Sequence, residues 1–170
     1  MQRSPLVPDV VVDICQQCVP GARNLPGQWT QNGAFVVTRT LPCSGKAEVQ
    51  YLLHALGEVR NGLCLVACHG SCRHAQGNRR AEVRIATLRK LLGEIGLEPE
   101  RVELVHCEPA TSEQTALAAV RAAVGRLAAL GPNPALESAP PAPEARPVAE
   151  GARTVELHRA YAVGSDEPRP

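Results

Sequence analysis

Four short, almost continuous apolar runs alternate with longer segments whose apolar residues recur at a helical period. The runs cover residues 10–14, 34–38, 63–67 and 102–105. Uninterrupted apolar runs of this length are typical of strands that are buried on both faces, as in a parallel sheet. This alternation restricts the fold more than any other feature of the chain.

Two of the intervening segments predict amphipathic helices. Residues 46–60 and residues 78–96 each carry their apolar side chains on one stripe. In the second segment, Asn78 is predicted to be the N-cap, and Gly96 is predicted to end the helix.

A third helix is predicted to begin near Thr111 or Ser112 and to end at Gly131. The connection after the first strand, residues 16–33, is rich in Pro and Gly and predicts only a short helix. The order of elements therefore predicts an α/β domain with a single open, mostly parallel four-stranded sheet flanked by helices.

The composition changes at residue 132. Residues 1–131 are expected to form one domain, whereas residues 132–170 are rich in Pro, Ala and Glu and predict a linker and an extended tail. Residues 154–163 alternate in polarity, which fits either an added strand or a disordered tail.

Composition excludes several classes of function. The formal charge is only +1 and aromatic residues make up 2% of the chain, so neither a nucleic-acid-binding nor a membrane-surface protein is indicated. No signal peptide and no membrane span are predicted, and the expected location is the cytoplasm. Clustered cysteines in that compartment favour metal ligands or redox groups over structural disulfides.

The cysteines follow the ends of the predicted strands. The chain contains seven of them, and six come after a strand: Cys15, Cys18, Cys43, Cys68, Cys72 and Cys107. Because the carboxyl ends of parallel strands meet at one edge of the sheet, these thiols are expected to gather there. The seventh, Cys64, begins its strand and is interpreted as a small buried hydrophobic residue.

Three chemistries fit such a cluster. An iron–sulfur cluster needs four converging thiolates. Structural zinc also takes four Cys or a Cys/His mixture, usually in pairs close in sequence. The Cys15–Cys18 pair, CQQC, also fits a thiol–disulfide redox site. The spacing matches neither a zinc ribbon nor a ferredoxin motif, because Cys43 stands alone between two pairs.

The succession of motifs resembles one known family. CQQC, PCSGK, ACHGSC followed closely by GN, and GLEPERVEL occur in this order between residues 10 and 131. The combination is similar to the iron–sulfur delta subunit of methyl-viologen-reducing hydrogenase, the MvhD/FlpD family. The resemblance implies a 2Fe–2S cluster and a role in electron transfer.

The resemblance also implies the ligands. The family cysteines fall on Cys15, Cys18, Cys43, Cys68 and Cys72, which are five candidates for four ligand positions. This chain departs from the family where three residues, rather than four, separate Cys68 from Cys72, and where an acidic residue before the second cysteine is absent.

Two histidines lie among these cysteines. His69 and His74 are interpreted either as donors of hydrogen bonds to the cluster, which would raise its reduction potential, or as solvent-facing loop residues.

The implied function is that of one component in a larger complex. The chain is expected to relay electrons between an electron-input or catalytic subunit and a flavin subunit of the heterodisulfide-reductase A type, which can bifurcate electrons. The sequence has no GxGxxG motif, so FAD is expected only in that partner. No catalytic residue is assigned, and the chain is not expected to be an enzyme by itself. The alternatives are a zinc-stabilised adaptor and a CxxC thiol–disulfide oxidoreductase.

Overall fold

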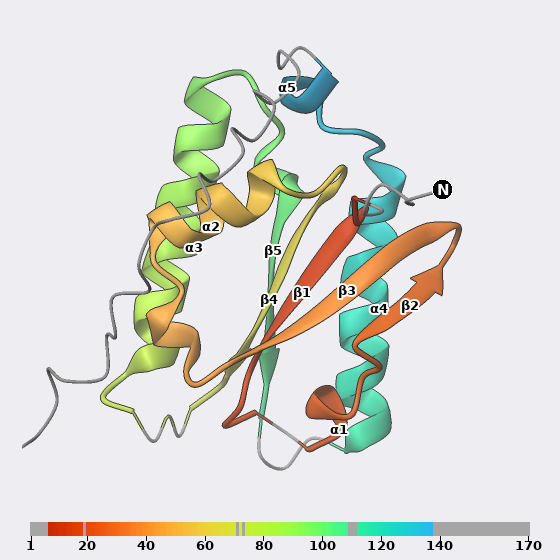
Figure 1. Cartoon of the computed structure of the whole chain (residues 1–170). Helices are drawn as coiled ribbons and strands as arrows, with labels where there is room; N and C mark the ends of the chain where they lie inside the picture. Colours follow the sequence, from red (N-terminus) through yellow and green to blue (C-terminus); the bar gives the residue numbers. More distant parts are fainter. Residues whose placement is uncertain (1–6, 19, 71, 73, 109–111, 138–170) are drawn as a thin grey trace, which may run out of the picture. The chain divides into compact units, whose positions relative to one another are not determined.

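A five-stranded mixed sheet forms the centre of the domain. The computed structural model of the chain describes residues 7–18, 20–70, 72, 74–108 and 112–137 (Figure 1). The strands are β1 (Val10–Cys15), β2 (Gln28–Gln31), β3 (Ala34–Leu41), β4 (Gly62–Cys68) and β5 (Val102–Cys107). Their order in the sheet is β2-β3-β1-β4-β5. β1 is parallel to both β3 and β4, β5 is parallel to β4, and β2 is antiparallel to β3.

The four predicted strands are all present, but the predicted count of four strands is wrong. β2 is the additional strand, and it joins β3 through a hairpin at Asn32 and Gly33, whose φ angles are 52° and 81°. Two central residues with positive φ form the tight turn that suits a two-residue hairpin, and Asn-Gly is its preferred sequence. β2 has alternating exposed and half-buried residues rather than an apolar run, because it is the edge of the sheet.

Helices cover both faces of this sheet. They are α1 (Pro20–Arg23), α2 (Val49–Gly57), α3 (Gly77–Glu94), α4 (Glu113–Ala129) and α5 (Pro134–Glu137), with single 3-10 turns at η1 (Ser44–Lys46) and η2 (Pro99–Arg101). α2 and α3 pack on one face and α4 on the other (Figure 1). The two apolar layers consist almost entirely of Val, Leu, Ile, Ala and Cys.

The helix ends confirm two predictions and correct one. Ser112 caps α4, since its hydroxyl accepts a hydrogen bond from the Thr115 N–H at 3.2 Å. Gly96 follows the end of α3 with φ at 79°, a conformation that Gly adopts without strain. Asn78, however, is not the N-cap of α3. That helix begins one residue earlier, and Asn78 is buried in its first turn.

A buried arginine ties the start of β5 to the end of α4. The side chain of Arg101 is 1% exposed and donates hydrogen bonds to the carbonyl oxygens of Asn61, Gly131 and Pro132, and it also pairs with Glu98. These bonds satisfy carbonyl groups that would otherwise be buried without partners. They fix the loops at the edge of the sheet opposite the carboxyl ends of the strands.

The segment predicted to be a linker begins with an ordered turn. The N–H of Asn133 donates to the carbonyl of Arg60, and α5 follows. The remainder of that segment, residues 138–170, lies outside the described residues. Among the helices of the described residues, none has both the length and the apolar character required to cross a membrane.

Candidate metal centre

Two thiols meet where the neighbouring strands β1 and β4 end. Cys15 is the last residue of β1 and Cys68 is the last residue of β4. Their Sγ atoms lie 3.8 Å apart, although 53 positions separate them in the sequence. The parallel pairing of β1 with β4 is what brings both carboxyl ends to the same edge, as the sequence predicted.

A third thiol joins them from the turn after β1. The N–H of Cys18 donates to the carbonyl of Cys15, which folds the CQQC segment back on itself. The Sγ atom of Cys18 lies 3.7 Å from that of Cys68. The Sγ atoms of Cys15, Cys18 and Cys68 all lie within 4.8 Å of one another, and all three residues are buried. This group is called the thiol triad below.

Cys43 and Cys72 form a second pair on the side of α3. Cys43 immediately precedes η1, and Cys72 lies a few residues before α3. Gly77, the first residue of α3, lies against both sulfurs. A β-carbon at Gly77 would lie 2.5 Å from the Sγ of Cys43 and 3.4 Å from the Sγ of Cys72. Cys43 is buried and Cys72 is half-buried.

Ser44 connects the pair to the triad. It follows Cys43 in the sequence, and its backbone N–H donates a hydrogen bond to the sulfur of Cys15. Each of the five family cysteines therefore lies at the carboxyl edge of the sheet, three as the triad and two as the pair beside it.

Hydrogen bonds and burial set the protonation of the triad. The thiol of Cys18 donates to the sulfur of Cys15, and together with backbone N–H groups it lowers the pKa of Cys15 to about 5 despite burial. The same bond, burial and the charge on Cys15 raise the pKa of Cys18. Burial and the charge on Cys15 also raise the pKa of Cys68, to about 11. Within the triad, these shifts favour ionisation of Cys15 over ionisation of Cys18 and Cys68.

The start of α3 supplies donors to the pair. Burial opposes ionisation of Cys72, but hydrogen bonds from the backbone N–H groups of His74, Asn78 and Gly77 outweigh it and lower its pKa. Burial raises the pKa of Cys43. Free N–H groups at a helix start stabilise negative charge, which makes this position suitable for a thiolate.

The other two cysteines lie in the apolar layer. Cys64 is fully buried within β4, as predicted, and burial raises its pKa. Cys107 ends β5 beside Cys68 in the sheet register and is also buried, which raises its pKa.

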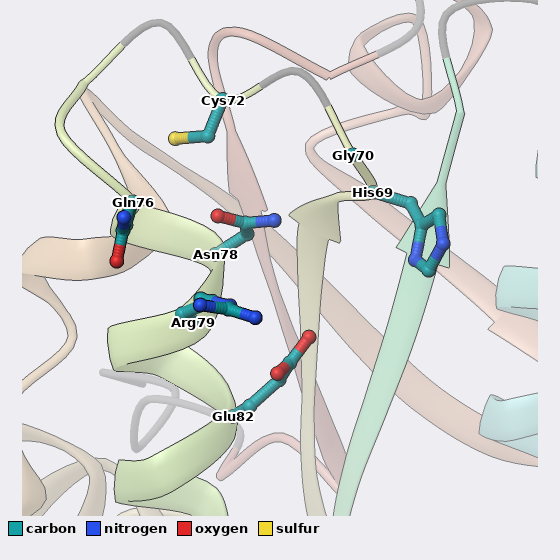
Figure 2. Close-up of a pocket in the computed structure, with 7 residues that line it drawn as sticks. All are labelled: His69, Gly70, Cys72, Gln76, Asn78, Arg79 and Glu82. Carbon is teal, nitrogen blue, oxygen red and sulfur yellow. The ribbon is translucent and has the colours of Figure 1, made fainter.

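The histidines take different positions. The ring of His69 packs edge-on against His106 of β5 at 5.3 Å, and its Nε2 lies 3.7 Å from Glu108. Figure 2 shows this ring turned toward β5 and away from Cys72. His74 is exposed and contacts Cys72 through its backbone, since its carbonyl accepts from the Cys72 thiol at 3.8 Å.

A polar pocket of about 500 Å³ opens beside Cys72 (Figure 2). It is lined by His69, Gly70, Cys72, Gln76, Asn78, Arg79 and Glu82. A smaller pocket of about 160 Å³ adjoins Cys43 and carries Lys46, His74 and Arg80. The cysteine pair therefore lies close to the surface, between polar and cationic side chains.

The donor set fits a thiolate-bound metal. Two sulfurs bound to one tetrahedral metal ion at about 2.3 Å lie about 3.8 Å apart. The Cys15–Cys68 and Cys18–Cys68 separations of 3.8 and 3.7 Å match this spacing. Soft thiolates select iron–sulfur clusters, zinc or Cu(I) over hard cations.

Reasoning from the sequence assigned no role to Ser44, Gly45 or Gly77. A β-carbon at Gly45 would lie 2.6 Å from the α-carbon of Gly77, so η1 and α3 approach each other through two glycines. The small residues that follow Cys43 are the signal that could have indicated this close approach.

Comparison with known proteins gives one family. The sequence model described as "Methyl-viologen-reducing hydrogenase, delta subunit" matches residues 10–131. The matched range contains all five cysteines of the triad and the pair.

Individual relatives agree with this match. The chain is 36% identical over 100 residues to an F420-non-reducing hydrogenase iron-sulfur subunit of Archaeoglobus profundus, covering 57% of this chain and 72% of the relative. It is 31% identical over 129 residues to an F420-non-reducing hydrogenase vhu iron-sulfur subunit of Methanocaldococcus jannaschii, covering 75% of this chain and 96% of the relative.

A further similarity involves a much longer protein. The chain is 29% identical over 112 residues to one of the subunits of the ferredoxin:CoB-CoM heterodisulfide reductase of Methanosarcina mazei. The match covers 63% of this chain but only 14% of that protein.

Proposed function

Because the chain belongs to the family of the delta subunit of methyl-viologen-reducing hydrogenase, we propose that it is an electron-transfer subunit that holds one 2Fe–2S cluster. The observation that carries this proposal is the thiol triad, which the fold assembles from two strand ends at one buried edge. Four of Cys15, Cys18, Cys43, Cys68 and Cys72 serve as the ligands.

The residues at the carboxyl edge of the sheet contribute to this function in different ways. Such a cluster accepts and releases one electron at a time when it is bound. The triad supplies buried thiolates, and the surrounding Val and Ala side chains exclude water from them. The start of α3 directs backbone N–H groups at Cys72, which stabilise negative charge on that side.

Electrons enter and leave through the side of the cysteine pair. Cys72 is the one half-buried member of the five and lines a polar pocket, while a second pocket with cationic side chains is lined by Cys43. Electron transfer requires a short path to a partner's cofactor, so the partner docks against this edge. Lys46, Arg79 and Arg80 favour a partner surface that is acidic there.

The similarity to the heterodisulfide reductase of Methanosarcina mazei supports a specific partner. A segment of that longer protein resembles this chain, so a domain of this kind occurs there within one polypeptide. We propose that the present chain associates with a flavin- and iron–sulfur-containing protein of the heterodisulfide-reductase A type, and receives electrons from a hydrogenase-like or other input subunit. FAD and any electron bifurcation belong to the partner. The seven free thiols suit the reducing cytoplasm.

The decisive experiment is metal analysis of protein produced and purified without oxygen. We expect about two irons and two acid-labile sulfides per chain, and a visible spectrum that dithionite bleaches. Stoichiometric zinc without iron, from cells supplied with iron, would contradict the proposal.

The geometry of the triad also favours one alternative, a single tetrahedral zinc ion in an adaptor protein. Three sulfurs within 4.8 Å of one another suit one ion with a fourth ligand from Cys43 or Cys72. A colourless, zinc-containing protein that still assembles with its partner would support this alternative.

The low pKa of Cys15 favours a second alternative, thiol–disulfide exchange by Cys15 and Cys18. In that case, the metal-free protein would reduce a disulfide substrate, and replacing Cys15 with Ser would abolish the activity. Burial of both thiols argues against this reaction, because the attacking sulfur must reach its substrate.

The partner can be tested by copurification and hydrogen–deuterium exchange. In the complex, residues 15–20, 43–46 and 68–78 are expected to exchange more slowly than in the free chain. Slower exchange confined to α2 would instead indicate docking on a helical face.

A further inference from the structure

Ser44 has a buried hydroxyl group without a partner. The residue is fully buried, and its Oγ has no hydrogen-bond partner among the described residues. Buried hydroxyl groups are nearly always hydrogen-bonded, because desolvation without a partner costs free energy. The position therefore calls for an acceptor that the protein atoms alone do not supply.

The surroundings of Ser44 indicate what that acceptor is. Ser44 follows Cys43 directly, and its own N–H already donates to the sulfur of Cys15. Its carbonyl accepts from the N–H of Ala47 at 3.1 Å, so the backbone of the turn is fixed. The next residue, Gly45, packs against Gly77 at the start of α3. Ser44 thus occupies the place where the triad and the pair meet.

This inference rests on the proposed function, since the acceptor is part of the metal centre. We infer that the hydroxyl of Ser44 donates a hydrogen bond to a sulfur of the cluster held by these cysteines, and that this bond raises the reduction potential of the cluster.

The direction of the effect follows from charge. One electron delivered to the cluster increases the negative charge on its sulfurs, and a donor directed at a sulfur stabilises the more negative state. A hydroxyl can donate in this way without titrating, so the effect persists across neutral pH. Ser44 is a positioning and tuning residue, not a ligand.

The test compares three variants purified without oxygen. Ser44→Ala removes the hydroxyl, Ser44→Thr retains it, and Ser112→Ala removes the capping hydroxyl of α4 as a control distant in sequence. Iron and sulfide are measured first in each protein, and the midpoint potential is then determined with dithionite as the reductant.

We expect Ser44→Ala to keep its iron but to favour the reduced state about tenfold less, which is a shift of ~59 mV to more negative potential for one electron. Ser44→Thr is expected to restore most of the shift, and Ser112→Ala to leave the potential unchanged.

A second measurement needs no variant. Brief exposure of the wild-type protein to D2O replaces a hydroxyl hydrogen before protected backbone amides exchange. Pulsed electron paramagnetic resonance of the reduced protein should then detect a deuteron coupled to the cluster. If this coupling is absent from the iron-loaded wild type, the inference is wrong even if Ser44→Ala fails to fold.

The outcomes separate the two proposals. A wild-type chain without iron and sulfide contradicts the proposed function. A wild-type chain with its cluster, together with an iron-loaded Ser44→Ala variant of unchanged potential, contradicts only the role of Ser44. In that case the hydroxyl binds a buried water molecule instead.

Discussion

Gly77 presents its α-carbon to the sulfur of Cys43 so closely that a β-carbon at Gly77 would lie 2.5 Å from Sγ. No side chain larger than hydrogen fits there without displacing the thiol or the start of α3. The first turn of α3, whose N–H groups donate to Cys72, is held against the cysteine pair by this contact.

Replacing Gly77 with Ala is therefore expected to reduce iron content and to destabilise the protein by about 1–3 kcal/mol through overpacking. Helix propensity alone predicts the opposite effect, an increase in the free energy of unfolding of up to about 1 kcal/mol, because Ala favours a helix more than Gly does. Gly93→Ala is the matched control on the same helix, because the nearest atom to its β-carbon would be Pro99 Cγ at 3.7 Å. Iron analysis and thermal unfolding are compared between the Gly77→Ala and Gly93→Ala proteins. A Gly77→Ala protein with its full iron content would show that the contact with Cys43 is unimportant.

Replacing Cys43 with Ser is expected to remove or strongly alter the cluster, because a hard hydroxyl ligand suits iron–sulfur chemistry poorly. Cys72→Ser is expected to have a milder effect, since Cys72 is more exposed than Cys43. Cys64→Ala is the control, because that thiol lies within the apolar layer. Visible absorption and iron content measure how much of the cluster each variant retains. A dependence on Cys64 but not on Cys43 would contradict the assignment of the edge.

Tyr51 is expected to resist ionisation. Burial and the neighbouring carboxylate of Asp13, which accepts a hydrogen bond from the Tyr51 hydroxyl at 3.0 Å, raise the pKa of Tyr51 to about 12. The folded state retains a proton that the unfolded state loses near pH 10. The contribution of this group to stability is therefore complete below pH ~10 and is lost as the pH rises toward ~12.

Phenolate absorbance measured against pH tests this expectation in the wild-type protein and in the Tyr51→Phe variant. The difference between the two titrations is the contribution of Tyr51. The component that the variant lacks should titrate near pH 12 in the folded protein. Titration of that component at the ordinary tyrosine pKa would show that the bond to Asp13 is not made.

Arg101→Met is expected to destabilise the fold by about 3–5 kcal/mol, because it leaves the carbonyls of Asn61, Gly131 and Pro132 buried without their donor. Arg126→Met is the matched control. Arg126 also pairs with a glutamate, Glu103, but its side chain is 59% exposed, so its loss should cost less than about 1 kcal/mol. Thermal unfolding of both proteins gives the comparison, and equal losses would contradict the assigned role of Arg101.

The sequence predicted the parts of the fold that have a strong period. The strands that became β1, β3, β4 and β5 were evident as apolar runs, because a strand buried on both faces leaves no polar interruption. β2 was missed because an edge strand of four residues with half-exposed side chains has no such run. The Asn32-Gly33 turn was the available signal, and it depends on backbone conformation rather than on hydrophobicity.

For the site, sequence order predicted the shared edge but not the contacts within it. Parallel pairing brings Cys15 and Cys68 together, and that pairing follows from the pattern of elements. The proximity of Cys43 to Cys72 depends instead on how η1 packs against α3. That packing is close because Gly45 and Gly77 have no side chains. Likewise, His69 lies next to Cys68 in sequence, but it follows the end of β4, and its ring packs on His106.

The central position of β1 also has a consequence for how the protein matures. The chain can form the Cys15–Cys18 turn early, but Cys68 joins it only when β1 pairs with β4, and parallel strands require a crossover connection before they pair. Contacts between residues so distant in sequence cost loop-closure entropy, which slows their formation. Before the sheet forms, the chain therefore presents at most the Cys15–Cys18 turn, and the complete thiol triad exists only once β1 has paired with β4. Under the proposed function, a chain in which β1 has not paired with β4 lacks the thiol triad and is expected to remain without metal.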